Sequence, residues 1–87
     1  MTLDDVCEKY GDERGNLVLR LLKEDDGSPS STVLVEGSPR SLLLLAELLS
    51  AVALDEKEEG FSISPFSAGK FHFSEKSELG VYINCVR

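Results

Sequence analysis

The residue types that carry most catalytic and metal-binding chemistry are scarce in this chain, which has one histidine, two cysteines and no tryptophan. Cys7 and Cys85 lie far apart and form no C-x-x-C pair, so a structural zinc site is not expected. His72 has no serine or cysteine at a spacing that indicates a nucleophile. The sequence therefore predicts no catalytic residues, no metal site and no cofactor, in a protein that is not an enzyme.

Basic residues are also few: 9 Lys and Arg stand against 16 Asp and Glu, which gives a net charge of −7. Nucleic acid is therefore not an expected partner, because binding to phosphates requires clustered Lys and Arg. The acidic residues gather in two tracts, Glu24-Asp25-Asp26 and residues 55–59. These tracts are either solvated loops or surfaces that capture a basic partner by electrostatic steering.

Long apolar runs are missing as well, since none is long and uninterrupted enough to span a bilayer. The first residues carry acidic side chains, Asp4 and Asp5, where a secretory signal would carry basic ones. We therefore expect a cytoplasmic protein with reduced thiols and no membrane partner. With 87 residues, the chain is expected to form a single domain over residues 1–87 with little margin of stability.

The strongest positive signal is a helix over about residues 39–54, which follows a capping serine, Ser38, and has Pro39 at its first position. At about 100° per residue, one broad apolar stripe forms the expected core face. This stripe contains Leu42, Leu45, Leu48, Leu49, Val52 and Ala53, and the opposite side contains Arg40, Glu47 and Ser50. Leu43 and Leu54 project on the polar side, where they are either ordinary surface leucines or part of a partner-binding face.

Shorter segments flank this helix. Alternating and β-branched patterns predict strands over residues 16–23, 31–36, 61–64, 70–74 and 79–86, with the last two paired as a hairpin. A leucine-rich helix is the alternative for residues 16–23. Residues 2–10 form either a short helix that begins with a capping box at Thr2 or an extended edge segment. The expected fold is an α+β two-layer sandwich, with one long helix on a largely antiparallel sheet in the order β-β-α-β-β-β.

The period of two in the strands assigns side chains to the two faces of this sheet. The face expected to pack on the helix carries Phe61, Ile63, Phe71, Phe73, Val81, Ile83 and Cys85. The opposite face, open to solvent or to a partner, carries Arg20, Leu22, His72, Tyr82 and Asn84. The partner-binding hypothesis therefore names Leu43, Glu47 and Leu54 on the helix, with Arg20, His72, Tyr82 and Asn84 on the sheet. A protein partner, or a homodimer, would bind through such surfaces.

Three short motifs, spread over about residues 31–87, carry a resemblance to a known family. They are Glu36-Gly37-Ser38-Pro39, where a strand runs into the helix, then Leu45-Ala46-Glu47-Leu48-Leu49, and the terminal Ser77-Glu78-Leu79-Gly80-Val81-Tyr82-Ile83. The chain resembles the family thirty-two immunity proteins of bacterial polymorphic-toxin systems. The resemblance implies a cytoplasmic, non-enzymatic protein, similar in role to an antitoxin, that binds and blocks a cognate toxin domain. The alternative is a small homo-oligomeric structural or interaction domain.

Overall fold

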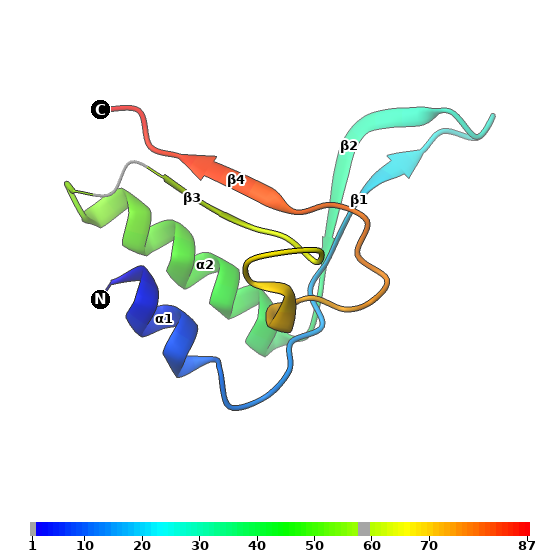
Figure 1. The fold of residues 1–87 in the computed structure, drawn as a ribbon. Helices are drawn as coiled ribbons and strands as arrows, with labels where there is room; N and C mark the ends of the chain where they lie inside the picture. The colour runs from blue at the N-terminus through cyan, green and yellow to red at the C-terminus, as the bar shows by residue number, and fades with distance from the viewer. Residues whose placement is uncertain (1, 58–59) are drawn as a thin grey trace.

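The computed structural model describes residues 2–57 and 60–87, which form two helices and two small antiparallel sheets. Helix α1 (Leu3–Lys9) lies beside the long helix α2 (Pro39–Leu54). Strands β1 (Val18–Lys23) and β2 (Pro29–Glu36) form a hairpin that projects beyond the helices (Figure 1). Strands β3 (Gly60–Ile63) and β4 (Val81–Asn84) pair with each other and run along α2. The α+β class is confirmed, and the single sheet is replaced by two.

Helix α1 confirms the helical interpretation of residues 2–10. Its capping box is complete: the Asp5 N–H donates to Thr2 Oγ1, and the Thr2 N–H donates to Asp5 Oδ2, both at 3.1 Å. Val6 and Tyr10 are buried against the body of the protein. Because a helix this short is marginal in water, this docking is what stabilises it.

Helix α2 begins and ends where the sequence predicts. The Ser41 N–H donates to the hydroxyl of the N-cap Ser38 at 3.2 Å, and Pro39 occupies the first turn. Its buried residues are Ser41, Leu44, Leu48, Ala51 and Val52. The predicted core stripe was therefore right for Leu48 and Val52 and wrong for Leu42 and Leu49, which are 42% and 45% exposed, and for Ala53, which is also exposed. The cause is α1, which packs on one flank of α2 and so rotates the buried face toward itself.

The segment that precedes β4 joins the two sheets along the second edge of β1. Leu17 forms an isolated parallel bridge with Phe73. The Leu19 N–H donates to the buried Ser77 hydroxyl at 3.0 Å, and the Leu19 carbonyl accepts from the N–H groups of Glu78 and Leu79. At Gly80, a Cβ atom would lie 2.5 Å from the Ile63 carbonyl oxygen, so only glycine permits this close approach to β3.

Residues 70–74 were predicted as a strand, and this prediction is wrong. Gly69 adopts a left-handed conformation (φ +82°), after which Lys70–His72 form one turn of 3-10 helix, η1. Phe71 is consequently exposed rather than inward, and His72 is buried rather than outward. The predicted hairpin between residues 70–74 and 79–86 is also absent, because β4 pairs with β3 instead.

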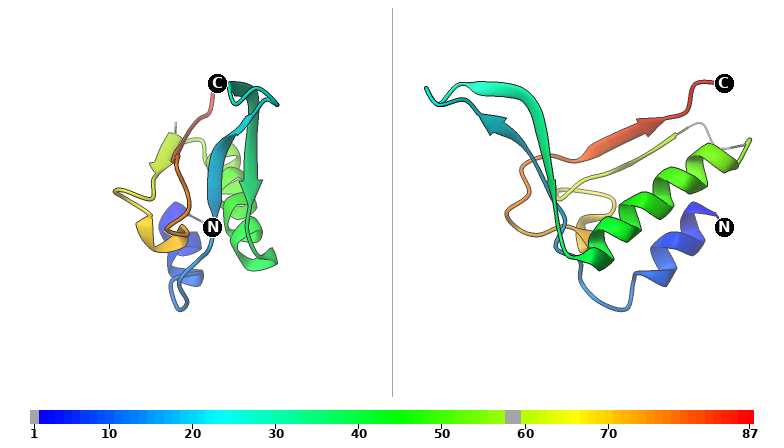
Figure 2. Two further views of the ribbon diagram at one scale, coloured as in Figure 1. Left: turned by 90° about the vertical axis from the view of Figure 1, so that its right-hand side faces the viewer. Right: turned by 180° about the vertical axis from the view of Figure 1, so that it is seen from behind.

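The hydrophobic core lies where α1, α2, the first half of β1 and the bridge at Phe73 meet. Its buried members are Val6, Tyr10, Leu17, Leu19, Leu44, Leu48, Ala51, Ile63 and Phe73. The distal half of the β1–β2 hairpin extends away from this cluster (Figure 2), and Leu21 and Val33 on it are partly exposed. The molecule accordingly measures 43 Å along its longest axis and 22 Å along its shortest.

Candidate functional site

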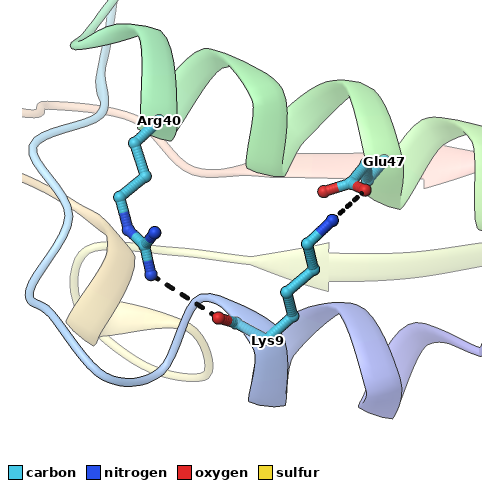
Figure 3. Close-up of polar contacts among 3 residues, drawn as sticks. All are labelled: Lys9, Arg40 and Glu47. Carbon is cyan, nitrogen blue, oxygen red and sulfur yellow. Dashed lines mark hydrogen bonds and ion pairs between the residues drawn. The ribbon is translucent and has the colours of Figure 1, made fainter.

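The residues proposed for partner binding on α2 divide into two groups. Leu43 and Leu54 are exposed, as expected. Glu47 instead faces α1, where its Oε1 accepts a hydrogen bond from Lys9 Nζ at 2.7 Å (Figure 3). Lys9 also lowers the pKa of the Glu47 carboxyl group through this hydrogen bond. Glu47 therefore joins the two helices, and its predicted place on an open face is wrong.

Arg40 and Tyr10 extend the same contact toward the start of α2. Arg40 donates to the Lys9 carbonyl at 3.5 Å and pairs with Asp12 (Figure 3 shows the first of these contacts). Its guanidinium group lies over the Tyr10 ring, 5.0 Å from the centroid. Interaction with the Glu47 carboxylate raises the pKa of Tyr10, so its hydroxyl stays protonated. On the side of α2 that the sequence marks as polar, α1 thus partly covers Glu47, whereas Arg40 and Ser50 stay exposed.

The residues proposed on the open sheet face are only partly brought together. Tyr82 and Asn84 are exposed on β4 and alternate with Val81 and Ile83, so both point away from α2. Arg20, on β1, also points away from the core but is partly buried and belongs to the other sheet. His72 is only 6% exposed, and burial lowers its pKa, so the ring is neutral at pH 7. Its predicted place on this face is wrong.

The first acidic tract occupies the tip of the projecting hairpin, at the far end from the helices (Figures 1 and 2). The turn is ordered by hydrogen bonds: the Glu24 N–H donates to the Ser28 carbonyl at 2.7 Å, and the Gly27 N–H donates to the Glu24 carbonyl at 2.8 Å. Asp26 Oδ1 accepts from both the hydroxyl and the N–H of Ser28, which lowers the pKa of Asp26. The side chains of Glu24, Asp25 and Asp26 are exposed. We call this turn the acidic tip.

The second acidic tract follows α2, and Glu58 and Glu59 lie outside the described residues. Glu56 is exposed, and Asp55 Oδ1 accepts a hydrogen bond from the Lys57 N–H at 2.9 Å. Arg87 donates to the carbonyl oxygens of Val52 and Asp55 at 2.8 and 2.6 Å. A cation at these carbonyl groups is favourable at a helix C-terminus, so this contact secures the end of α2.

A groove that the sequence did not reveal lies between α2, β2 and the start of β4. It has a volume of about 270 Å³ and is lined by apolar side chains. Its lining consists of Leu19, Val33, Val35, Leu45, Leu49, Leu79, Gly80, Val81 and Ile83. We call it the apolar groove. Two of its residues, Leu45 and Leu49, belong to the apolar stripe that the sequence predicts as core. An apolar stripe shows only that leucines share one side of the helix, and it does not distinguish a core from a surface groove.

The described part of the chain contains no cluster of three or more His, Cys, Asp or Glu side chains that could hold a metal ion. Within residues 2–57 and 60–87, no helix is both long and apolar enough to cross a membrane. Comparison of the chain with protein-family models, with curated proteins and with solved structures finds no match. Any assignment of function therefore depends on the surfaces described above and on the motifs in the sequence.

Proposed function

We propose that this chain is a non-enzymatic binding protein of the immunity type, which engages a basic bacterial toxin domain and blocks it. The observation that carries the proposal is the acidic tip, where three carboxylate side chains are exposed on an ordered turn that projects beyond the helices. The resemblance of residues 31–87 to the family thirty-two immunity proteins supports it independently.

Electrostatics favours this role for the tip. Because the turn is held by backbone hydrogen bonds, little conformational entropy is lost when a partner binds. The net charge of −7 extends the attraction beyond the tip and accelerates association with a positively charged surface. Salt screens exposed charges over about 10 Å at 0.1 M ionic strength, so association should slow as salt increases.

The test uses the product of the gene next to the one that encodes this chain. The two proteins are co-expressed, and both binding and protection of the host cell from growth arrest are measured. In the tip variant, Glu24→Gln, Asp25→Asn and Asp26→Asn change the net charge from −7 to −4. The control variant makes the same change at exposed sites elsewhere, with Glu8→Gln, Glu13→Gln and Glu75→Gln.

We expect the tip variant to associate about tenfold more slowly and with a weaker dependence on salt, while the control retains most of the rate. Loss of protection should accompany loss of binding. If the association rate fell equally in the tip variant and in the control variant, net charge rather than the acidic tip would govern binding. Failure of the chain to bind or to protect against the neighbouring product would overturn the proposed function.

A further inference from the structure

The outer edge of β2 carries backbone groups that the rest of the described chain does not use. On β1, the backbone groups of Leu17 and Leu19 point toward residues 72–79, to which they are hydrogen-bonded. Val18 and Arg20 therefore point toward β2, where they pair with Glu36 and Leu34. The N–H and C=O groups of Val33 and Val35 consequently point away from β1. Over residues 2–57 and 60–87, no other strand pairs with this edge.

The same edge borders the apolar groove. Val33 and Val35 are 50% and 43% exposed, and both line the groove, as do Leu45 and Leu49 from α2. Seen from behind, β2 and α2 diverge from the connection between Glu36 and Pro39 (Figure 2). Residues of both elements line the groove. A strand added to the outer edge of β2 would therefore lie beside a row of uncovered leucines.

Charge identifies which chain can supply that strand. The nine residues 27–35 include no charged side chain, and Glu47 is the only charged residue from Ser41 to Leu54. Glu47 is engaged with Lys9 on the other flank of α2. The groove lining and residues 33–35 are thus a neutral patch on a chain of charge −7, and Glu36, which ends β2, is the charged residue that follows them in the chain. A second copy brings an equally neutral patch, so the contact places no like charges together.

We propose that a second copy of this chain covers the apolar groove by pairing its β2 edge antiparallel to the first, about a two-fold axis at Leu34. Val33 of each copy then lies opposite Val35 of the other, and each of these pairs exchanges two N–H···O=C hydrogen bonds. The pairing uses the part of β2 that is in regular register with β1. It avoids the part of β2 that lies opposite Leu21 to Lys23 of β1, where the register shifts. Antiparallel pairing also directs the two acidic tips to opposite ends of the dimer. This proposal does not depend on the toxin-binding function.

The expected dimer is weak. A three-residue edge and a few half-exposed aliphatic side chains bury less than the roughly 800 Å² per partner of a standard interface. Sedimentation equilibrium over a wide range of concentration should show the average mass rising from 9.5 kDa toward twice that value. Hydrogen exchange of the Val33 and Val35 amides should slow over the same range, because these two N–H groups gain partners only in the dimer.

Two variants with matched controls test the geometry. Val35→Pro removes an outward N–H that β1 does not use, so the hairpin should tolerate it while dimerisation is lost; Val35→Thr keeps the N–H and should still dimerise. Leu49→Lys places a charge in the groove and should also abolish the dimer. Leu43→Lys, at an exposed position on the other flank of α2, should leave it intact. If Val35→Pro fails to fold, the comparison of Leu49→Lys with Leu43→Lys still tests whether the groove forms the dimer contact.

A strict monomer at every concentration would overturn the proposal. A dimer that survives both Val35→Pro and Leu49→Lys would equally overturn it, since another surface would then form the contact. If the chain stays monomeric but the neighbouring gene product protects the Val33 and Val35 amides, the edge binds a different protein and the second-copy proposal is wrong. That last result would leave the toxin-binding function standing, so the two proposals fail separately.

Discussion

The two flanks that border the buried face of α2 differ in what lies against them. The flank that carries Arg40 and Glu47 is partly covered by α1, through contacts with Lys9 and Tyr10. The flank that carries Leu42 and Leu49 is left half exposed beside the apolar groove. Amphipathic helices normally bury the apolar flank and expose the polar one. The comparison teaches that a charged side chain such as Glu47 can be partly covered when it finds a partner, and it leaves an uncovered row of leucines on which we propose that a second copy binds.

The largest expected difference is between two neighbouring leucines of α2. Leu48 is 0% exposed, and Leu48→Ala should lower the free energy of unfolding by about 2–5 kcal/mol through lost burial and a residual cavity. Leu49 is 45% exposed, and Leu49→Ala should cost less than about 1.5 kcal/mol. Denaturant unfolding at low protein concentration measures both in the monomer. Equal losses at the two positions would show that Leu49 belongs to the core and that the open flank is an incorrect assignment.

A smaller effect is expected when the covered flank is weakened through α1. Thr2→Ala removes the hydroxyl that accepts the Asp5 N–H, and the loss of an N-cap typically costs about 1 kcal/mol. Thr2→Ser keeps the hydroxyl and serves as the control. Denaturant midpoints should fall for the alanine variant alone. An unchanged midpoint in Thr2→Ala would mean that α1 contributes little to global stability, so that the covered flank is open part of the time.

The elements that could be predicted are those with local signals. Ser38 and Pro39 mark the start of α2, and the capping box at Thr2 marks α1, because a cap acts within one turn of its own helix. The β1–β2 hairpin follows from two apolar segments separated by a short turn-forming segment. These features need no knowledge of distant parts of the chain.

The features that could not be predicted depend on contacts between distant segments. Phe71 and Phe73 alternate as in a strand, yet the left-handed backbone at Gly69 starts a 3-10 turn and buries only Phe73. The pairing of β3 with β4 is determined by packing on α2 rather than by proximity in sequence. The rotation of the buried face of α2 depends on where α1 docks, which the pattern of α2 alone does not encode. The acidic tip was among the surfaces that the sequence indicated, whereas the groove required the fold.

The smallest effect is expected at the Lys9–Glu47 pair, the polar contact on the covered flank that depends on pH. Lys9 lowers the pKa of Glu47 below its ordinary value of 4.5 through their hydrogen bond. Since the folded pKa is the lower one, the ionised carboxylate stabilises the fold above pH 4.5, and this contribution is lost as the pH falls through the folded value. In turn, the hydrogen bond that Lys9 donates to Glu47 raises the pKa of Lys9, so the contribution from Lys9 is complete below its ordinary value of 10.5 and is lost at more alkaline pH.

Glu47→Gln should therefore lower the melting temperature slightly at pH 7, with the difference from the unmodified chain shrinking toward pH 3. Lys9→Met provides the second arm of a double-mutant cycle, because the two changes should not add if the pair acts as a unit. Both side chains are partly exposed, so high salt should also reduce the difference. A difference that is the same at pH 3 and pH 7 would show that Glu47 acts through packing rather than charge, and that its ion pair with Lys9 does not hold α1 on α2.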